Sequence, residues 1–368
     1  MRRRPFLLFT LFLLTWLLGG CASGINPTAW TTLFVRNGTV YLADLEQVRA
    51  LDATTGEQLW AFPAQPNLRQ YGPFYTVTLL NDELLMVTSS EQRGGLVSHT
   101  YGVLRALRLE DGREAWAQPF VAGEFVAPGA AGDGIFVIGS SDRNIYALRV
   151  EDGSLVWTYP TRGRVWATPR ILSDTVYIAS LDHTLYALDL RTGALRWQFQ
   201  AQGAMADSPL ILGDVLYLGA FDRNLYALRL SDGQELWRFT GSNWFWGTPA
   251  TDGSRLYAAD VNGVVYALDP ATGQEIWRSQ VEGTVRLGPA VGGDGQRVLV
   301  ATENGILFGL DAADGFVLWR QSGEGVIADM AVHGDRVFIT WLHAAHRAQS
   351  FYVENGRPIW QYPPAAQK

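Results

Sequence analysis

The sequence holds one cysteine and one lysine in 368 residues. A single thiol excludes disulfides within the chain, and it excludes zinc sites and haem attachment built on cysteine pairs. The lysine, Lys368, is the last residue, so arginine carries almost all of the positive charge. Acidic residues outnumber basic ones by 36 to 29, for a formal charge of -7. Such an acidic chain is a poor candidate for nucleic-acid binding, which needs lysine and arginine at the phosphates.

The single cysteine follows a segment that resembles an export signal. Arg2–Arg4 supply a positive start and Pro5–Leu18 an apolar run of fourteen residues, which is too short to span a bilayer comfortably. The sequence Leu-Gly-Gly before Cys21 resembles the lipobox of bacterial lipoproteins. This resemblance implies that residues 1–20 are a signal peptide, that Cys21 carries the lipid, and that residues 21–27 form a short linker. The alternative is an ordinary cleaved signal with a chance cysteine, or an uncleaved anchor.

The lipoprotein signal also sets where the protein is expected. Without residues 1–20 the formal charge becomes -10, because three arginines and no acids are removed. Ala22 follows Cys21 in place of the aspartate that retains lipoproteins at the inner membrane of enteric bacteria. We therefore expect an extracytoplasmic protein that is lipid-anchored to the outer membrane. In a cell without an outer membrane, the anchor would lie in the outer leaflet of the cell membrane.

The rest of the chain is an eightfold repeat of about 40 residues. Its tryptophans are spaced by 56, 41, 40, 40, 40, 42 and 41 residues, at Trp60, Trp116, Trp157, Trp197, Trp237, Trp277, Trp319 and Trp360. A glycine in a short polar turn stands four residues before each one, at Gly56, Gly112, Gly153, Gly193, Gly233, Gly273, Gly315 and Gly356. This period, with turns between alternating apolar runs, is typical of four-stranded propeller blades. The tryptophans are expected to be buried where neighbouring blades pack.

We therefore predict an all-β protein, a single eight-bladed β-propeller of four-stranded antiparallel blades over residues 28–362, with a C-terminal tail at 363–368. The first blade is expected at about 28–62 and the last at about 326–362. The ring should close by packing of blade faces, with a small strand exchange between the termini as the alternative. The spacing of 56 residues between Trp60 and Trp116 exceeds the repeat by about fifteen residues, and most of this excess falls within residues 89–102. They are expected as a hairpin extension or a binding loop.

One copy of the repeat, from Leu185 to Trp197, is very similar to the quinoprotein (pyrroloquinoline-quinone-like) repeat, in which a Tyr-Ala-Leu-Asp strand, a Thr-Gly turn and a tryptophan recur. The copy from Val265 to Trp277 matches as closely. The resemblance implies the propeller fold. The family includes quinone-dependent dehydrogenases and also non-catalytic lipoproteins that assist the outer-membrane β-barrel assembly machine. This chain, a lipoprotein with one propeller, resembles the second branch more.

An enzyme of the first branch would show features that this sequence lacks. Many quinoprotein alcohol dehydrogenases carry a vicinal disulfide beneath the cofactor and a bound calcium ion, whereas this chain has no cysteine pair. Asp142, Asp182 and Asp222 recur at intervals of 40, which indicates hairpin turns and not metal ligands. The five histidines fall in different blades or loops. We expect no enzyme, no quinone cofactor and no metal site. A quinone-dependent oxidoreductase or a ligand-sensing propeller is the alternative.

Partner binding is expected at the loops of one end of the ring and at the mouth of its channel. In each blade we compare the residue that stands three positions before the aligned proline of the inner strand. Five of these eight residues are aromatic. The eight are Trp30, Phe74, Phe125, Trp166, Ala206, Trp246, Arg286 and Ile327. They form a candidate aromatic collar, unless they pack between inner strands. Four loop residues complete the candidate surface: Arg162, Arg164, Trp244 and Phe245. We predict a monomeric scaffold that binds a protein or peptide partner in the cell envelope.

Overall fold

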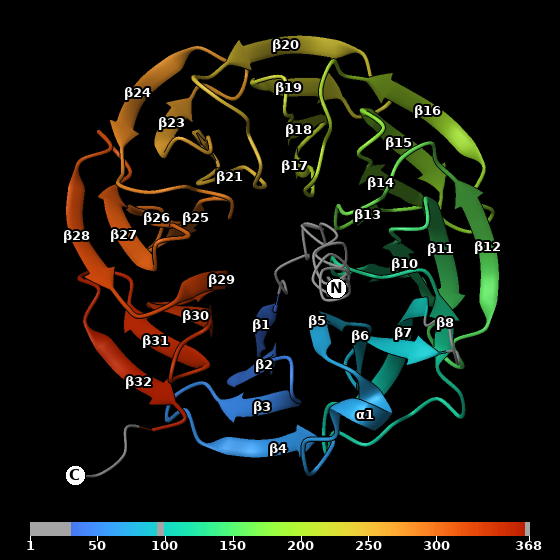
Figure 1. Cartoon of the computed structure of the whole chain (residues 1–368). Coiled ribbons are helices and arrows are strands. Elements are labelled where there is room, and N and C mark those ends of the chain that lie inside the picture. Colours follow the sequence, from blue (N-terminus) through green and yellow to red (C-terminus); the bar gives the residue numbers. More distant parts are fainter. Residues whose placement is uncertain (1–30, 94–98, 365–368) are drawn as a thin grey trace, which may run out of the picture.

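The computed structural model describes residues 31–93 and 99–364. Eight four-stranded sheets stand around a central channel, and each sheet is built from four consecutive strands (Figure 1). Neighbouring strands are antiparallel throughout, as in the pairing of Thr175 with Asp189. The first strand of each blade lies nearest the channel and the fourth lies at the circumference (Figure 1). The predicted eight-bladed propeller is confirmed. Within the described residues, no helix is long and apolar enough to cross a membrane.

The first four blades follow the chain in order. Blade 1 contains β1 (Leu33–Arg36), β2 (Thr39–Ala43), β3 (Val48–Asp52) and β4 (Gln58–Phe62). A four-residue helix, α1 (Leu68–Tyr71), precedes blade 2, which contains β5 (Phe74–Leu79), β6 (Leu84–Arg93), β7 (His99–Arg108) and β8 (Phe120–Ala122). Blade 3 contains β9 (Ala130–Gly132), β10 (Ile135–Gly139), β11 (Asn144–Arg149) and β12 (Leu155–Pro160). Blade 4 contains β13 (Arg170–Leu172), β14 (Thr175–Ala179), β15 (Thr184–Asp189) and β16 (Leu195–Gln200).

The other four blades complete the ring. Blade 5 contains β17 (Leu210–Leu212), β18 (Val215–Gly219), β19 (Asn224–Arg229) and β20 (Glu235–Thr240). Blade 6 contains β21 (Ala250–Thr251), β22 (Leu256–Ala259), β23 (Val264–Leu268) and β24 (Glu275–Gln280). Blade 7 contains β25 (Ala290–Gly292), β26 (Arg297–Ala301), β27 (Ile306–Asp311) and β28 (Val317–Ser322). Blade 8 contains β29 (Val326–His333), β30 (Arg336–Leu342), β31 (Ala348–Tyr352) and β32 (Pro358–Tyr362).

Each repeat tryptophan joins its blade to the next one. Trp157 of blade 3 packs on the turn glycine of blade 4, where a Cβ added to Gly193 would lie 2.7 Å from the indole. Its Nε1 donates a hydrogen bond of 2.9 Å to the carbonyl of Leu190. The same contact recurs around the whole ring. Three of the eight tryptophans are buried, Trp157 among them, whereas Trp197 and the remaining four are half-buried. The expectation that all eight would be buried was therefore wrong for those five.

The ring closes between blades 8 and 1 by packing, and no strand is exchanged among the described residues. Trp360 packs on Gly56 as in every other pair of blades. Its Nε1 donates to the carbonyl of Ala53 at 3.0 Å. On the inner strands, the Asp329 carboxylate accepts a hydrogen bond of 2.8 Å from the Leu33 amide. The junction of the two terminal blades is therefore built like the other seven.

The extra residues of blade 2 lengthen a hairpin, as one of the two alternatives predicted. β6 and β7 each contain ten residues and pair along their full length, from Leu84 with Arg108 to Arg93 with His99. At the base of the extension the buried Arg105 donates to Ser89 Oγ at 2.9 Å and forms an ion pair of 2.6 Å with Glu91. The base of the hairpin is thus fixed to the ring.

Candidate functional site

The candidate surface lies where two kinds of connection meet at one end of the ring. One kind leads from the outer strand of a blade to the inner strand of the next, as residues 161–169 do between β12 and β13. The other is the turn between the second and third strands of a blade. The two are joined by hydrogen bonds, such as that from Trp166 Nε1 to Ser141 Oγ at 3.1 Å. We call this end of the ring the channel face.

The predicted collar separates into two groups. Trp166, Trp246 and Arg286 line the central cavity, together with the smaller Ala206 and Ile327. Phe74 and Phe125 instead are at most 1% exposed and belong to the packing between blades. Trp30 lies outside the described residues. The structure thus places part of the predicted collar at the channel, whereas the two phenylalanines pack between blades as in the alternative.

The misplacement of Phe125 has a simple cause. Gly123 to Pro128 is one residue shorter than the equivalent segment Gly163 to Pro169, so counting back from the proline shifts the register by one. Aligned on the glycine, Phe125 corresponds to a column of buried residues that each enter a core between two blades, namely Val165, Met205, Phe245 and Val285. Phe245 is 1% exposed, which corrects its prediction as a surface loop residue.

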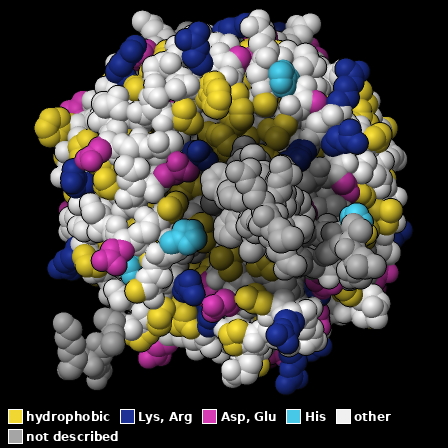
Figure 2. All heavy atoms as spheres, in the orientation of Figure 1, with side chains coloured by type: hydrophobic (Ala, Val, Ile, Leu, Met, Phe, Trp, Pro, Cys, Tyr) yellow, Lys and Arg dark blue, Asp and Glu magenta, His cyan; other side chains and the backbone are white. Residues whose placement is uncertain are grey.

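An aromatic cluster, formed by the exposed Trp244 and the half-buried Phe221 and Trp246, lies beside the channel. Trp244 is 45% exposed and stacks on Phe221, with ring centroids 5.2 Å apart and planes at 18°. Phe221 contacts Trp246 with centroids 4.7 Å apart. The Arg286 guanidinium lies 4.8 Å from the centroid of the Trp246 ring and 3.2 Å from a carboxylate oxygen of Glu303. Figure 2 shows apolar side chains gathered above the channel mouth, on the side of β20 and β21 in Figure 1.

Two of the predicted loop residues lie on the neighbouring part of the channel face. Arg162 and Arg164 are exposed, and the guanidinium of Arg164 lies 5.9 Å from the Trp166 ring centroid. Phe221 was missed by sequence reasoning, although a signal existed. The equivalent turn position holds Ser141, Leu181 or Val261 in other blades. Phe221 is the aromatic residue among these equivalent positions.

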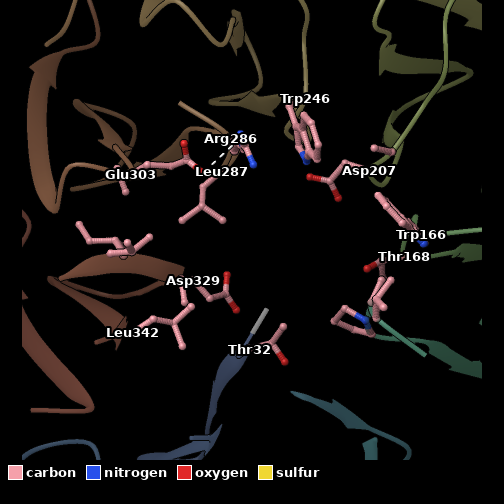
Figure 3. A pocket seen from close by; sticks show the side chains of 18 of the residues that line it. Thr32, Trp166, Thr168, Asp207, Trp246, Arg286, Leu287, Glu303, Asp329 and Leu342 are labelled. Carbon is pink, nitrogen blue, oxygen red and sulfur yellow. Dashed lines mark ion pairs between the residues drawn. The ribbon is translucent and has the colours of Figure 1, made fainter. Parts of the chain in front are cut away.

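The central cavity has a volume of about 300 Å³ and is lined by residues of seven blades. Two carboxylates, those of Asp207 and Asp329, face it from different walls (Figure 3). Burial raises the pKa of both groups, and the charge of Asp207 adds to the effect on Asp329, whose pKa reaches about 7. The sequence also contained a signal for Asp207. The equivalent positions in the neighbouring blades hold Ala167 and Gly247, so an acidic residue at this position departs from the repeat.

The cavity does not fit pyrroloquinoline quinone. That cofactor carries three carboxylates, whereas two carboxylates already face the channel and the lining Arg286 is paired with Glu303. Among the described residues no three histidines, cysteines or acids come together to hold a metal ion. The turn aspartates serve the hairpins instead, since Asp182 accepts hydrogen bonds from Tyr186 and from the Thr184 amide.

The chain matches a known family over most of its length. The family described as "Outer membrane protein assembly factor BamB" matches residues 100–263 and 261–368. The chain belongs to the BamB family. BamB of Yersinia pestis is 32% identical over 147 residues, which are 38% of this chain and 33% of that protein. BamB of Moranella endobia (strain PCIT) is 28% identical over 144 residues, with the same two shares. The chain thus spans about a third of the length of these curated relatives.

Solved structures show the same fold. BamB from Moraxella catarrhalis superposes with a TM-score of 0.65 at 18% identity, over 84% of this chain and 90% of that one. The computationally designed protein Ika8 superposes with a TM-score of 0.72 at 14% identity, over 87% and 95% of the two chains. A designed protein and a BamB share this architecture, so the architecture by itself specifies no function.

Proposed function

We propose that the chain is a non-catalytic, lipid-anchored scaffold that binds a protein or peptide partner through its channel face, in the assembly of outer-membrane proteins. The observation that carries the proposal is the aromatic cluster of Phe221, Trp244 and Trp246, in which Trp244 is exposed and the other two side chains are half-buried. Tryptophan and arginine are enriched at the centres of protein interfaces. Membership of the BamB family supports the assembly role, since two relatives carry the name of an assembly factor.

The ring holds this surface ready for a partner. Phe221 contacts both tryptophans, and the turn that holds it is fixed to the connection that holds them by the hydrogen bond from the Phe245 amide to the Ala220 carbonyl at 3.3 Å. Little conformational freedom is then lost on binding, which favours affinity. Because the cavity also disfavours a cofactor with three carboxylates, we propose that the chain binds no quinone and is no dehydrogenase.

Crosslinking in cells tests the proposal. A photoreactive amino acid in place of Trp244 is expected to capture a protein of the outer-membrane assembly machinery, because this side chain is 45% exposed on the channel face. The same amino acid in place of Phe316, which is 71% exposed beside the outer strand β28, is the matched control and should not capture it. Equal capture from both positions, or capture from the circumference alone, would contradict the assigned surface.

The lipid anchor also belongs to the proposal, since Cys21 lies outside the described residues. Cys21→Ser is expected to move the protein from the membrane fraction to the soluble fraction, or to leave its signal unprocessed, as cell fractionation and mass spectrometry would show. Thr32 lines the cavity, so β1 begins on the channel face, and residues 22–32 can reach at most about 40 Å from it. The lipid would then hold this face toward the membrane. A Cys21→Ser protein processed and retained like wild type would refute the anchor.

A further inference from the structure

Two carboxylates face each other across the cavity in the middle of the ring. Figure 3 shows Asp207 between Trp246 and Trp166, and Asp329 on another wall near Thr32. They come from the connection before β17 and from the inner strand β29. A ligand between them would lie in the channel, beneath the mouth that carries the aromatic cluster.

Each carboxylate is held in place by backbone amides. Asp207 accepts hydrogen bonds from the Ser208 amide at 2.7 Å and from the Thr248 amide of the neighbouring blade at 2.9 Å. Asp329 accepts from the Met330 amide at 2.8 Å and from Leu33 of blade 1. Two amides occupy only part of the acceptor capacity of a carboxylate, which has about four lone-pair sites. Room for further donors therefore remains on both groups.

The negative charge of these carboxylates is poorly balanced. Within residues 31–93 and 99–364, neither aspartate forms an ion pair, and Arg286, which lines the same cavity, is paired with Glu303. The raised pKa of Asp329, about 7, and the raised pKa of Asp207 reflect this cost of burying charge. A cation placed between the two carboxylates would offset the cost and favour their ionised forms.

We propose that the cavity binds an organic dication, with an ammonium group at each of Asp207 and Asp329 and its aliphatic part in the space between them. The volume of about 300 Å³ suits a small ligand of this kind. Two sources share the chemistry: a free alkyl diamine, and two lysine side chains from a partner segment that enters the channel. The proposal does not rest on the proposed function.

Calorimetric titration of the full-length protein in detergent with cadaverine, a five-carbon diamine, tests the proposal. We expect binding at pH 8 and no binding of 1,5-pentanediol, which has the same length and no charge. Asp207→Asn and Asp329→Asn remove the negative charge and keep the size of the side chain. Each carboxylate oxygen accepts from one backbone amide, so each variant loses one of its two hydrogen bonds, and circular dichroism must show that it is folded like the wild-type protein. Each should weaken binding about tenfold or more. Asp133→Asn, in the turn between β9 and β10 at the other end of the ring, should leave binding unchanged.

The pH dependence gives a second readout that needs no variant. Because the cation binds ionised Asp329, and a pKa of about 7 leaves this group mostly protonated at pH 6, affinity should fall about tenfold from pH 8 to pH 6. Binding near pH 6 should release a proton, seen as heats that depend on the buffer. The other charged or titratable groups about the cavity and its two aspartates are the Arg286–Glu303 pair, His343 and Arg170.

The possible outcomes distinguish the two sources of the cation and also test whether the cation site exists. Displacement of cadaverine by the peptide acetyl-Lys-Gly-Lys-amide would support the cation site and indicate two lysines of a partner. Cadaverine binding without that displacement would support the site and indicate a free diamine. Equal binding of 1,5-pentanediol, pH-independent affinity, or no binding of either amine would overturn it. None of these results depends on crosslinking from position 244, so the partner surface succeeds or fails separately.

Discussion

Trp157→Ala is expected to lower the free energy of unfolding by about 3–5 kcal/mol. The indole is 8% exposed, and its loss would leave a cavity between blades 3 and 4 and an unpaired carbonyl at Leu190. Chemical denaturation followed by circular dichroism measures the change. Trp244→Ala removes an equal side chain that is 45% exposed, and it should cost less than about 1 kcal/mol. Similar losses in the two variants would show that the repeat tryptophans do not hold the blades together.

Gly193→Ala is expected to cost about 2–4 kcal/mol. The backbone φ of +71° is unfavourable by about 1–2 kcal/mol for any residue with a Cβ. The new methyl group would also lie 2.7 Å from the Trp157 ring, an overpacking that costs about 1–3 kcal/mol. Gly134 is the matched control, with a φ of +75° and nothing within 4 Å of an added Cβ. Gly134→Ala should show the backbone cost alone.

The two glycine variants also test the contact directly. On a Trp157→Ala background the methyl group at residue 193 meets no indole, so the added cost of Gly193→Ala should fall to that of Gly134→Ala. Such coupling is what contacting residues show in a double-mutant cycle. If the two costs added without coupling, the glycine would be required by its turn only, and the tryptophan contact would contribute nothing.

The fold could be predicted from the sequence because its rules repeat eight times. The tryptophan and the glycine that recur in every repeat form the same contact between neighbouring blades. An irregular repeat such as blade 2 leaves the pattern recognisable in the other seven. The insertion could be placed between two recognisable strands for the same reason. The periodicity predicted which residues share an environment and did not predict how far each is buried, so the half-buried Trp197 was missed.

The site was harder to predict because binding surfaces depart from the repeat. A connection shorter by one residue shifted the register at Phe125, and a surface role was assigned to the buried Phe245. Phe221, Asp207 and Asp329 are each an exception in an otherwise ordinary column. Sequence reasoning that looks for shared features passes over such residues, and only the ring brings them to one channel.

The closure of the ring has a consequence for the position of the anchor. Because blades 8 and 1 meet through the same tryptophan–glycine contact as any other pair, circular permutation should leave every sheet complete. Blades 3 and 4 are joined by only nine residues, 161–169. A linker of that length from residue 362 to residue 32 would allow new termini to open there. The N-terminus would still leave from the channel face, but beside blade 4, so the fold allows a lipid to be attached at any blade.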